Sequence, residues 1–379
     1  MNHTMNATLT LKDGIKLEAE SFGSENPMAG EVVFATGMAG YPESLTDPSY
    51  KGQILTLTYP LIGNYGVPEK KYWESGHIQA SGLIVSTYNE TPSHYLSKRS
   101  LSQWLKDEGI PALQIKDTRF LTQHLRDHGS QLGKIEFERS IDYYDPNTDN
   151  LVSQVATKDV TFYKSFIPNP KNHTVVYLDC GGKKNIVLCL LRRGVNVITV
   201  PWDFDPFTNE NQKRLETVIL NSFQDLNEMP KQVRHDKLFD GIVVSNGPGD
   251  PKFADKTIQI TKKALDTKLP LLGICLGHQL ITLAAGGDTT KLKYGHRAQN
   301  QPCLEVGTKR CIITTQNHGF AVSEIPPGFK AWFLNANDGT NEGIIHTKYP
   351  YMSTQFHPEA TPGPQDAEYV FDYFVSKIK

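Results

Sequence analysis

Short apolar runs alternate with helical patterns in the second half of the chain. The strand-like runs are VVYLD, VNVITVP, FDGIVVS and LPLLGI, and a helical pattern over residues 184–193 follows the first of them. Strands that are apolar without interruption are typical of a parallel sheet covered on both faces. The pattern therefore predicts an open, doubly wound, mostly parallel α/β sheet, in which ligands bind at the carboxyl ends of the strands.

The first half of the chain has a different pattern of apolar and polar residues. Alternating apolar and polar residues, separated by Gly, Pro and Asn, predict strands over 7–11, 31–36, 53–58 and 80–87, and helices over 100–108 and 117–128. A smaller, β-rich α+β domain is expected there. The proline-containing segment 166–172 is the best linker, so we predict domains over 1–170 and 171–379. Residues 203–237 are polar with only loose helical periodicity, and they receive no function.

Composition changes this picture little. Of the 379 residues, 38% are hydrophobic and 21% are charged, and the formal net charge is −2. These values argue against disorder, and they point to neither nucleic acid nor an anionic membrane as a partner. The sequence shows no run of 18 apolar residues and no signal or transit pattern at its start, so a cytoplasmic location is expected.

One of the five cysteines has a functional setting. The cysteines form no C-x-x-C pair, so neither a disulfide framework nor a metal site is predicted. Cys275 lies in GICLG, between the apolar run LPLL and the helical pattern QLITLAA. This order predicts a sharp strand-to-helix turn that exposes the thiol, and a helix N-terminus favours its thiolate form, which is the competent nucleophile.

A histidine and a glutamate near the end of the chain supply the complementary chemistry. His357 and Glu359 follow the strand-like MSTQF, as a base and the group that orients it. Together with Cys275 they suggest a Cys-His-Glu hydrolytic triad, with the backbone N–H groups of Leu276 and Gly247 as donors to an oxyanion. The alternative for each residue alone is structural, with Cys275 packed at a turn and His357 capped in a loop.

Longer motifs extend the pattern to nearly the whole chain. NGPGDP, GICLGHQ, QNHGF and FHPE resemble, in order and separation, the motifs of class I glutamine amidotransferases. GEVVFATGMAGYPESLTDPSYKGQIL, YPLIGNYG, DTRFLTQHLRDHGS and LDCGGKKN resemble the N-terminal domain of the small chain of carbamoyl-phosphate synthetase. GICLGHQ alone indicates a superfamily, whereas its combination with TDPSY and IGNYG is specific to this family.

The resemblance implies hydrolysis of L-glutamine to glutamate and ammonia through a thioester on Cys275. Ammonia would pass to a large synthetase component, which makes carbamoyl phosphate from bicarbonate and ATP for pyrimidine or arginine synthesis. ATP and Mg would then bind that partner and no cofactor would bind this chain, where Gly181-Gly182-Lys183 lacks the spacing of a phosphate-binding loop. By match of motif, glutamine would be held by Ser49, Gly247, Gly249, Leu276, Gln279, Asn317, Gly319 and Phe320. Because Ser49 lies in the first predicted domain, the resemblance implies an active site at the domain interface.

Two details refine this expectation. In ammonia-dependent members of the family a non-thiol residue replaces the nucleophile, whereas this chain retains Cys275, so glutaminase activity is expected. Residues 70–76 form a shorter segment than in many members, away from the catalytic motifs. We interpret His278 and His318, which also lie within family motifs, as structural, since neither is followed by a carboxylate that could orient it.

Two other functions stay open. A stand-alone amidase or γ-glutamyl hydrolase would use the same α/β domain, but it leaves the first 170 residues unexplained. A non-catalytic regulatory or scaffold chain would keep the fold and bind a synthetase, but retention of all three triad residues argues against it. An uncoupled glutaminase would waste glutamine, so we expect weak basal activity and stimulation on assembly. The sequence does not distinguish a free subunit from the front of a fused chain.

Overall fold

The computed structural model describes residues 6–167, 173–222 and 238–378. They form two units: unit 1 contains Met1–Leu151, Leu292–Gln299 and Thr361–Gly363, and unit 2 contains Val152–Lys291, Asn300–Ala360 and Pro364–Lys379. The predicted boundary near residue 170 and part of the predicted linker lie outside the described residues. The units divide earlier, because strand β10 (Thr161–Tyr163) pairs with β12 (Asn196–Pro201) of unit 2.

A closed barrel forms the centre of unit 1. Its strands follow the order β1-β2-β8-β6-β4-β3-β9, and a separate parallel pair is made by β5 and β7. The bounds are β1 Asn6–Leu11, β2 Lys16–Ser21, β3 Met28–Ala35, β4 Gln53–Leu57, β5 Leu61–Ile62, β6 Gly82–Val85, β7 Thr87–Tyr88, β8 Ala112–Gln114 and β9 Gln131–Glu136. The strands predicted over 7–11, 31–36, 53–58 and 80–87 correspond to β1, β3, β4 and β6.

Alternation along the barrel strands separates two cores. Ile54 of β4 joins a cluster that draws residues from all strands of the barrel, whereas its neighbour Leu55 joins a second cluster with Trp104. Successive side chains of a strand point to opposite faces, so one cluster fills the barrel and the other covers its outer wall. Strands β3, β4 and β6, which contribute to both clusters, are therefore buried on both faces.

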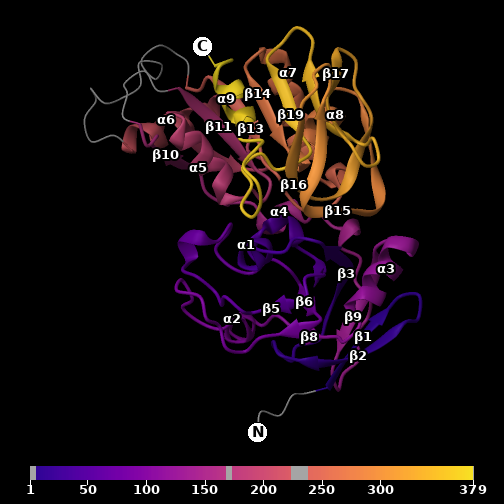
Figure 1. Ribbon diagram of the computed structural model, residues 1–379. Coiled ribbons are helices and arrows are strands. Elements are labelled where there is room, and N and C mark those ends of the chain that lie inside the picture. The colour runs from indigo at the N-terminus through magenta and orange to yellow at the C-terminus, as the bar shows by residue number, and fades with distance from the viewer. Residues whose placement is uncertain (1–5, 168–172, 223–237, 379) are drawn as a thin grey trace. The chain divides into compact units, whose positions relative to one another are not determined.

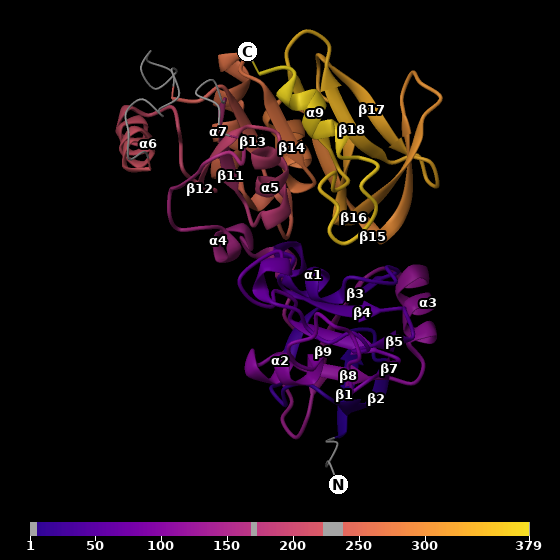
Figure 2. The same cartoon turned by 60° about the vertical axis from the view of Figure 1, so that its left-hand side comes forward.

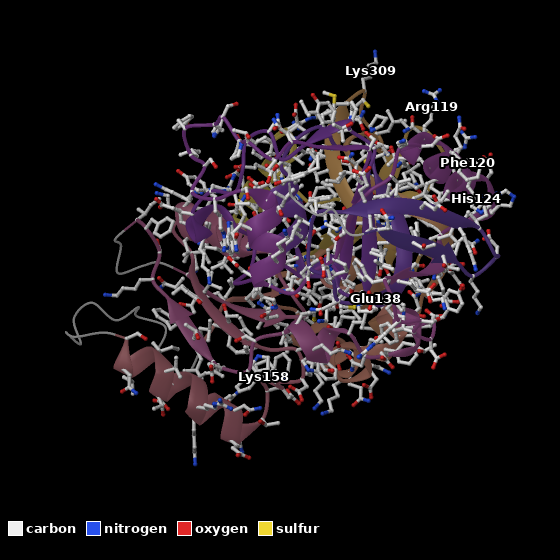
Figure 3. The ribbon with its side chains drawn as sticks, turned by 90° about the horizontal axis from the view of Figure 1, so that it is seen from below. Arg119, Phe120, His124, Glu138, Lys158 and Lys309 are labelled. Carbon is white, nitrogen blue, oxygen red and sulfur yellow. The ribbon has the colours of Figure 1, made fainter. Side chains whose placement is uncertain are left out.

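Two of the helices described in unit 1 begin at side-chain caps. The helices are α1 Tyr41–Thr46, α2 Leu101–Asp107 and α3 Thr118–His128, with 3₁₀ turns at Pro48–Tyr50, Lys70–Tyr72 and Pro146–Thr148. Ser100 and Asp117 accept hydrogen bonds from Gln103 N (3.2 Å) and Phe120 N (2.8 Å), which confirms both predicted helix starts. Arg119 and Phe120 lie on the exposed side of α3 (Figure 3), opposite the buried Leu121 and Leu125.

Within the described residues, unit 2 is built on one ten-stranded sheet in the order β10-β12-β11-β13-β14-β19-β18-β16-β15-β17. The further strand bounds are β11 Thr174–Asp179, β13 Gly241–Val244, β14 Leu271–Ile274, β15 Asp288–Glu305, β16 Cys311–Glu324, β17 Phe329–Asn335, β18 Asn341–His346 and β19 Tyr351–Thr354. The helices are α4 Val152–Val155, α5 Lys184–Arg192, α6 Asn209–Asn221, α7 Asp255–Thr267, α8 Leu276–Ala284 and α9 Tyr369–Val375, with a 3₁₀ turn at Pro251–Phe253. Of residues 203–237, α6 gives the helical part, and 223–237 lie outside the described residues.

The parallel part of this sheet is covered on both faces (Figure 1 and Figure 2). Strands β12, β11, β13, β14 and β19 pair in parallel. One cluster joins their side chains to α5 and α9, and the other joins them to α6, α7 and α8. This confirms the predicted doubly wound sheet.

An antiparallel region that the sequence analysis did not assign continues the same sheet. Strand β18 pairs antiparallel with β19, and β16, β15 and β17 extend the sheet beyond it. The motif QNHGF lies inside β16 rather than in a loop. Its polar residues follow one another without alternating apolar residues, so the sequence gives no strand pattern there, although these polar residues are buried in unit 2. No helix among the described residues is long and apolar enough to cross a membrane.

Candidate active site

The strand-to-helix turn after β14 holds Cys275 in an uncommon backbone conformation. Its φ is 53° and its ψ is −102°, and it is the N-cap of α8. Positive φ at a residue with a Cβ costs about 1–3 kcal/mol and persists only where the surroundings enforce it. The backbone N–H of Cys275 donates to Thr354 O at 2.8 Å, which ties the turn to strand β19. The predicted sharp strand-to-helix turn at Cys275, here called the elbow, is therefore present.

Two glycines allow the helix to approach the sheet this closely. A Cβ on Gly277 would overlap the carbonyl oxygen of Val244 in β13, and a Cβ on Gly273 would overlap the backbone of Gly277. Real Cβ atoms do not approach carbonyl oxygens so closely. The glycines of GICLG thus serve the close packing of α8 on β13 and β14.

Sheet register brings His357 and Glu359 to the same edge as Cys275. In parallel pairing, Ile274 of β14 is the partner of Thr354 of β19, so both strands end together at their carboxyl ends. His357 then bridges to Thr315 of β16, whose carbonyl accepts its backbone N–H at 2.9 Å. Glu359 Oε1 lies 2.6 Å from His357 Nδ1, and both residues are buried. Nε2 of His357 has no hydrogen-bond partner among the described residues.

Electrostatics favour the charged forms of this group. Burial acts against the imidazolium, but the Glu359 carboxylate and the Cys275 thiolate prevail and raise the pKa of His357 to about 10. Burial also acts to raise the pKa of Glu359, but Lys183 and His357 lower it to about 2. At neutral pH His357 is therefore an imidazolium and Glu359 a carboxylate.

A buried lysine, for which no catalytic role is predicted from the sequence, stands behind Glu359. Lys183 is 2% exposed, its Nζ lies 3.1 Å from Glu359 Oε1, and it also donates to the carbonyl of Ala360. Asn185 Nδ2 donates to Glu359 O at 2.5 Å. The available signal was a lysine just after a buried strand and two glycines, in LDCGGKKN. A lysine there stands at the carboxyl edge of the sheet, where a charge needs a partner.

Two backbone N–H groups are available for an oxyanion. Those of Leu276 and Gly247 donate no hydrogen bond within the described part of the chain. A Cβ on Gly247 would meet Leu276 Cδ2 at 2.8 Å, so the two loops lie against each other. Uncommitted donors beside a nucleophile are the arrangement that stabilises a tetrahedral oxyanion.

The other predicted substrate residues divide into three groups. Cys275 Sγ lies 3.6 Å from Asn317 O, and Gln279 Nε2 donates to Phe320 O at 2.9 Å, so these residues gather at the nucleophile. Gly249, with φ 82°, follows the Gly247 loop, and Gly319 lies between Asn317 and Phe320 on β16. Ser49 belongs to unit 1, where it is buried in a 3₁₀ turn whose cap is Asp47. Its contact with glutamine stays a prediction.

Gln355 is a second buried residue at the site that is not predicted from the sequence. Its Nε2 donates to Cys275 Sγ at 3.6 Å, and its Oε1 accepts from Gln279 Nε2 at 2.9 Å. The signal was its position two residues before His357, because residues two apart on an extended segment share a face.

The two other motif histidines have structural partners. His278 Nδ1 lies 2.8 Å from Ser353 Oγ, and burial lowers the pKa of His278 to about 3. His318 lies between Phe320 O at 2.8 Å and Gln316 Oε1 at 3.2 Å. The structural interpretation of both stays a prediction, and His318 also has a carboxylate, Glu342, at 4.0 Å.

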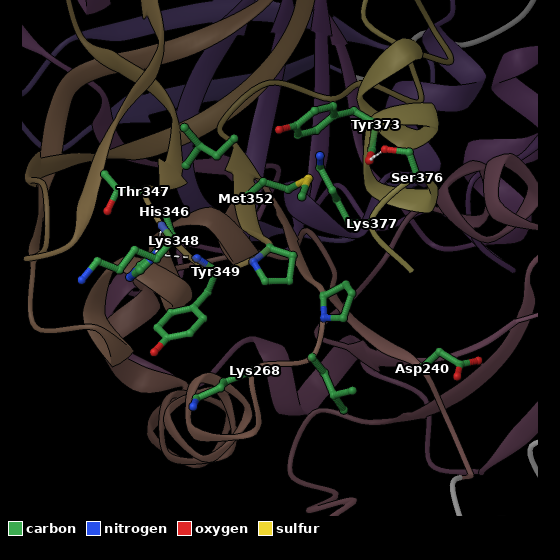
Figure 4. A pocket seen from close by; sticks show the side chains of 14 residues that line it. Asp240, Lys268, His346, Thr347, Lys348, Tyr349, Met352, Tyr373, Ser376 and Lys377 are labelled. Carbon is green, nitrogen blue, oxygen red and sulfur yellow. Dashed lines mark hydrogen bonds between the residues drawn. The ribbon is translucent and has the colours of Figure 1, made fainter. Parts of the chain in front are cut away.

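A hollow of about 630 Å³ lies near the amino ends of the parallel strands, opposite the ends that carry the triad (Figure 4). Its lining includes Asp240, Lys268 and Pro350, which precede β13, β14 and β19. Cys275 follows β14, so this hollow is separate from the triad by the length of the strand. The chemistry belongs to the carboxyl edge, where the groups present can cleave an acyl C–N bond through a thioester.

Comparison with known proteins agrees with this chemistry. Residues 176–377 match the glutamine amidotransferase class-I family, and residues 9–135 match the carbamoyl-phosphate synthase small chain, CPSase domain. The chain is 44% identical over 414 residues to multifunctional protein URA2 of Saccharomyces cerevisiae, covering 98% of this chain and 17% of that protein.

Two further relatives have similar identities. Mitochondrial carbamoyl-phosphate synthase (ammonia) of Homo sapiens is 45% identical over 386 residues, covering 98% of this chain and 24% of that protein. Multifunctional protein CAD of Squalus acanthias is 45% identical over 386 residues, covering 97% and 16%. The chain thus spans less than a quarter of the length of these relatives.

Proposed function

The chain belongs to the class I glutamine amidotransferase family and carries a carbamoyl-phosphate synthase small-chain domain, and from this premise we propose that it hydrolyses glutamine for a carbamoyl-phosphate synthase. The relatives alone do not decide the nitrogen source, because the human relative is named for ammonia. The observation that carries the proposal is Cys275, held at φ 53° on the elbow and coupled to His357 and Glu359.

The first half of the reaction forms a thioester. The Cys275 thiolate attacks the side-chain carbonyl carbon of glutamine, and the carbonyl electron pair moves to oxygen. The N–H groups of Leu276 and Gly247 stabilise that oxyanion. As the oxyanion collapses, the C–N bond breaks, and the His357 imidazolium gives its proton to the departing nitrogen, which leaves as ammonia.

The second half releases glutamate. His357, now neutral, takes a proton from water as that water attacks the thioester carbonyl. The C–S bond breaks, and the imidazolium and the Cys275 thiolate are restored. Glu359 holds the imidazole ring by its 2.6 Å contact with Nδ1 and stabilises the imidazolium without taking the proton.

Coupling to a synthetase is part of the proposal, and the family supports it. A large synthetase component would accept the ammonia and use bicarbonate, ATP and Mg, so we assign the nucleotide and the metal to that partner. Recognition of glutamine by Ser49, Gly249, Gln279, Asn317, Gly319 and Phe320 belongs to the same proposal. A cytoplasmic location and a supply of carbamoyl phosphate to pyrimidine or arginine synthesis are part of it too.

Glutamate and ammonia release from L-glutamine tests the proposal. The purified chain and Cys275→Ser are assayed alone and with a large synthetase component. We expect weak release by the chain alone, stimulation by the partner, and loss of at least about 10³-fold in Cys275→Ser, since the hydroxyl is a far weaker nucleophile without activation. The matched control is Cys303→Ser, because Cys303 is buried against Thr314 and Gln316 and lies outside the triad.

The outcomes separate the competing functions. Equal activity with and without the partner would favour a stand-alone amidase. No release in any mixture, together with failure of a glutamine-analogue electrophile to label Cys275, would favour a scaffold chain.

A further inference from the structure

Building on the proposed glutaminase function, we propose that Gln355 is a further catalytic residue, whose side-chain amide donates a hydrogen bond to the Cys275 thiolate and holds the sulfur in place. Gln355 Nε2 lies 3.6 Å from Cys275 Sγ, and the residue is 0% exposed. It therefore touches the reacting atom itself, beside the three residues of the triad.

Sheet register fixes this contact. Ile274 and Thr354 are register partners at the ends of β14 and β19, so the next residues, Cys275 and Gln355, leave the sheet side by side. The backbone N–H of Cys275 donates to Thr354 O at 2.8 Å, and that of Gln355 donates to Glu342 O at 2.8 Å. Both backbones are thus held at the place where the side chains meet.

Two hydrogen bonds made by Gln279 set the orientation of the Gln355 amide. Phe320 O can only accept, so the amide group of Gln279 that approaches it at 2.9 Å must be the NH₂ group. The same NH₂ group lies 2.9 Å from the Gln355 amide, which must present its oxygen there. The NH₂ group of Gln355 is consequently the end that faces Cys275 Sγ.

Deprotonation of Cys275 makes this donor important. As a thiol, Cys275 donates to Asn317 O at 3.6 Å. As a thiolate it loses that bond, and the negative end of the carbonyl then faces an anion. A hydrogen bond to a charged acceptor is stronger than one between neutral groups, so the N–H of Gln355 stabilises the thiolate more than the thiol.

The ionisable groups around Cys275 limit how much of the stabilisation of the thiolate comes from Gln355. From the segment after β19, the His357 imidazolium interacts directly with the thiolate, and Glu359 lies behind it with Lys183. Helix α8 contributes no charge here, because Leu276 and Gln279 are neutral and the neutral His278 is directed at Ser353. Strand β16 contributes the Asn317 carbonyl and His318, whose ring nitrogens face Phe320 O and Gln316. Gln355 therefore adds a neutral donor to a site whose main cation is His357.

Alkylation of Cys275 by iodoacetamide at a series of pH values tests the inference. The variants are Gln355→Leu, which removes the donor at similar size, and Gln355→Glu, which keeps the shape. We expect the pH of half-maximal alkylation rate to rise by roughly 1 to 2 units in Gln355→Leu, as for loss of a hydrogen bond to a charged group. Gln355→Glu should shift it further, because a carboxylate then faces the thiolate. With glutamine, kcat should fall about tenfold in Gln355→Leu while KM changes little.

Gln316→Leu is the matched control. Gln316 is 2% exposed, and its Nε2 donates to Cys303 Sγ at 3.4 Å, so the variant removes a buried amide from a sulfur that is not the nucleophile. Its alkylation profile at Cys275, read by mass spectrometry, should match the wild type.

A wild-type profile in folded Gln355→Leu would overturn the inference, as would an unchanged profile in the isosteric Gln355→Glu if the leucine variant fails to fold. Alkylation does not require glutamine turnover. A wild-type chain that shows the Gln355-dependent profile but releases no glutamate would therefore refute the proposed function while supporting the role of Gln355.

Discussion

At Cys275 the chain of charges runs inward from the nucleophile to a buried lysine. Cys275 faces His357, His357 faces Glu359 at 2.6 Å, and Glu359 faces Lys183 at 3.1 Å. Each ion is surrounded by protein, so each would be costly alone and is stable only beside the next. Because the pKa of Glu359 is lowered from 4.5 to about 2, its contribution to stability is present above pH 4.5 and is lost as pH falls toward 2.

Glu359→Gln should move the alkaline limb of the pH-rate profile to lower pH. The carboxylate is the first of the groups that raise the pKa of His357 from 6.5 to about 10, so its removal lowers that pKa and the imidazolium is lost earlier as pH rises. We also expect kcat to fall by roughly 10³ to 10⁴, since the ring loses its orienting partner. Steady-state glutaminase rates from pH 6 to about 10.5 measure both.

Glu368→Gln is the control for that change. Glu368 is partly exposed and paired with Arg193 at 3.3 Å, away from the triad. Its profile should match that of the wild type. An alkaline limb that stays in place in Glu359→Gln would show that Glu359 does not set the proton affinity of His357.

Lys183→Met should destabilise unit 2 strongly. The change removes one of the two cations that face the buried Glu359 carboxylate, and breaking a buried ion pair typically costs about 3–5 kcal/mol of unfolding free energy. Lys184→Met is the neighbouring control; Lys184 is exposed, so its change should stay within about 0.5 kcal/mol. Urea denaturation followed by circular dichroism compares the two. Equal midpoints would contradict a structural requirement for the buried ion pair.

At the scale of elements, the elbow depends on how closely α8 lies on the sheet. The helix shares clusters with β13 and β14, and Gly277 sits where any side chain would overlap Val244 O. The short distance places the first turn of the helix, and its free N–H groups, beside the nucleophile. The backbone of α8 is thus part of the chemistry.

Gly277→Ala should therefore reduce both stability and activity. The added methyl group forces α8 away from β13, with a cost of about 1–3 kcal/mol or more for overpacking against backbone. The oxyanion donor at Leu276 moves with the helix, so kcat should fall more than KM rises. Thermal unfolding and glutamine kinetics give the two readings. Gly76→Ala is the control, because no atom lies within 4 Å of its added Cβ; a Gly277→Ala variant as stable and active as this control would contradict the packing argument.

At the scale of the whole molecule, the units do not follow the order of the chain. Residues 292–299 are late in the sequence, yet they belong to unit 1. Thr36 N donates to Arg297 O at 3.0 Å, and Ser130 N donates to Lys293 O at 2.9 Å. A piece of the long strand β15 thus completes the hydrogen bonding of the first unit.

A fragment of residues 1–151 should show the loss of that segment. The amides of Thr36 and Ser130 lose their acceptors, so they should exchange with deuterium much faster in the fragment than in the full chain. Amides of Val33 and Leu55 serve as internal controls, because β3 and β4 pair with each other within the fragment. Equal protection of Thr36 and Ser130 in both proteins would show that 292–299 does not stabilise unit 1.

Local patterns in the sequence determined the elements and the reactive groups. Apolar runs indicated β11, β12, β13 and β14 because strands buried on both faces have no polar alternation. Sequence patterns also located α2 and α3, and glycines beside a cysteine located the elbow. Cys275, His357 and Glu359 could be grouped from sequence because each follows a predicted strand, and carboxyl ends of parallel strands meet at one edge.

The tertiary structure alone decided which residues support that group and where the units divide. Lys183 and Gln355 reach Glu359 and Cys275 from distant parts of the sequence, and their partners depend on strand order and register. The antiparallel strands β15 to β18 and the place of 292–299 depend on pairing between segments that carry no local signal for one another. Local propensity acts over a few residues, whereas burial of a charge or an amide depends on every element that surrounds it.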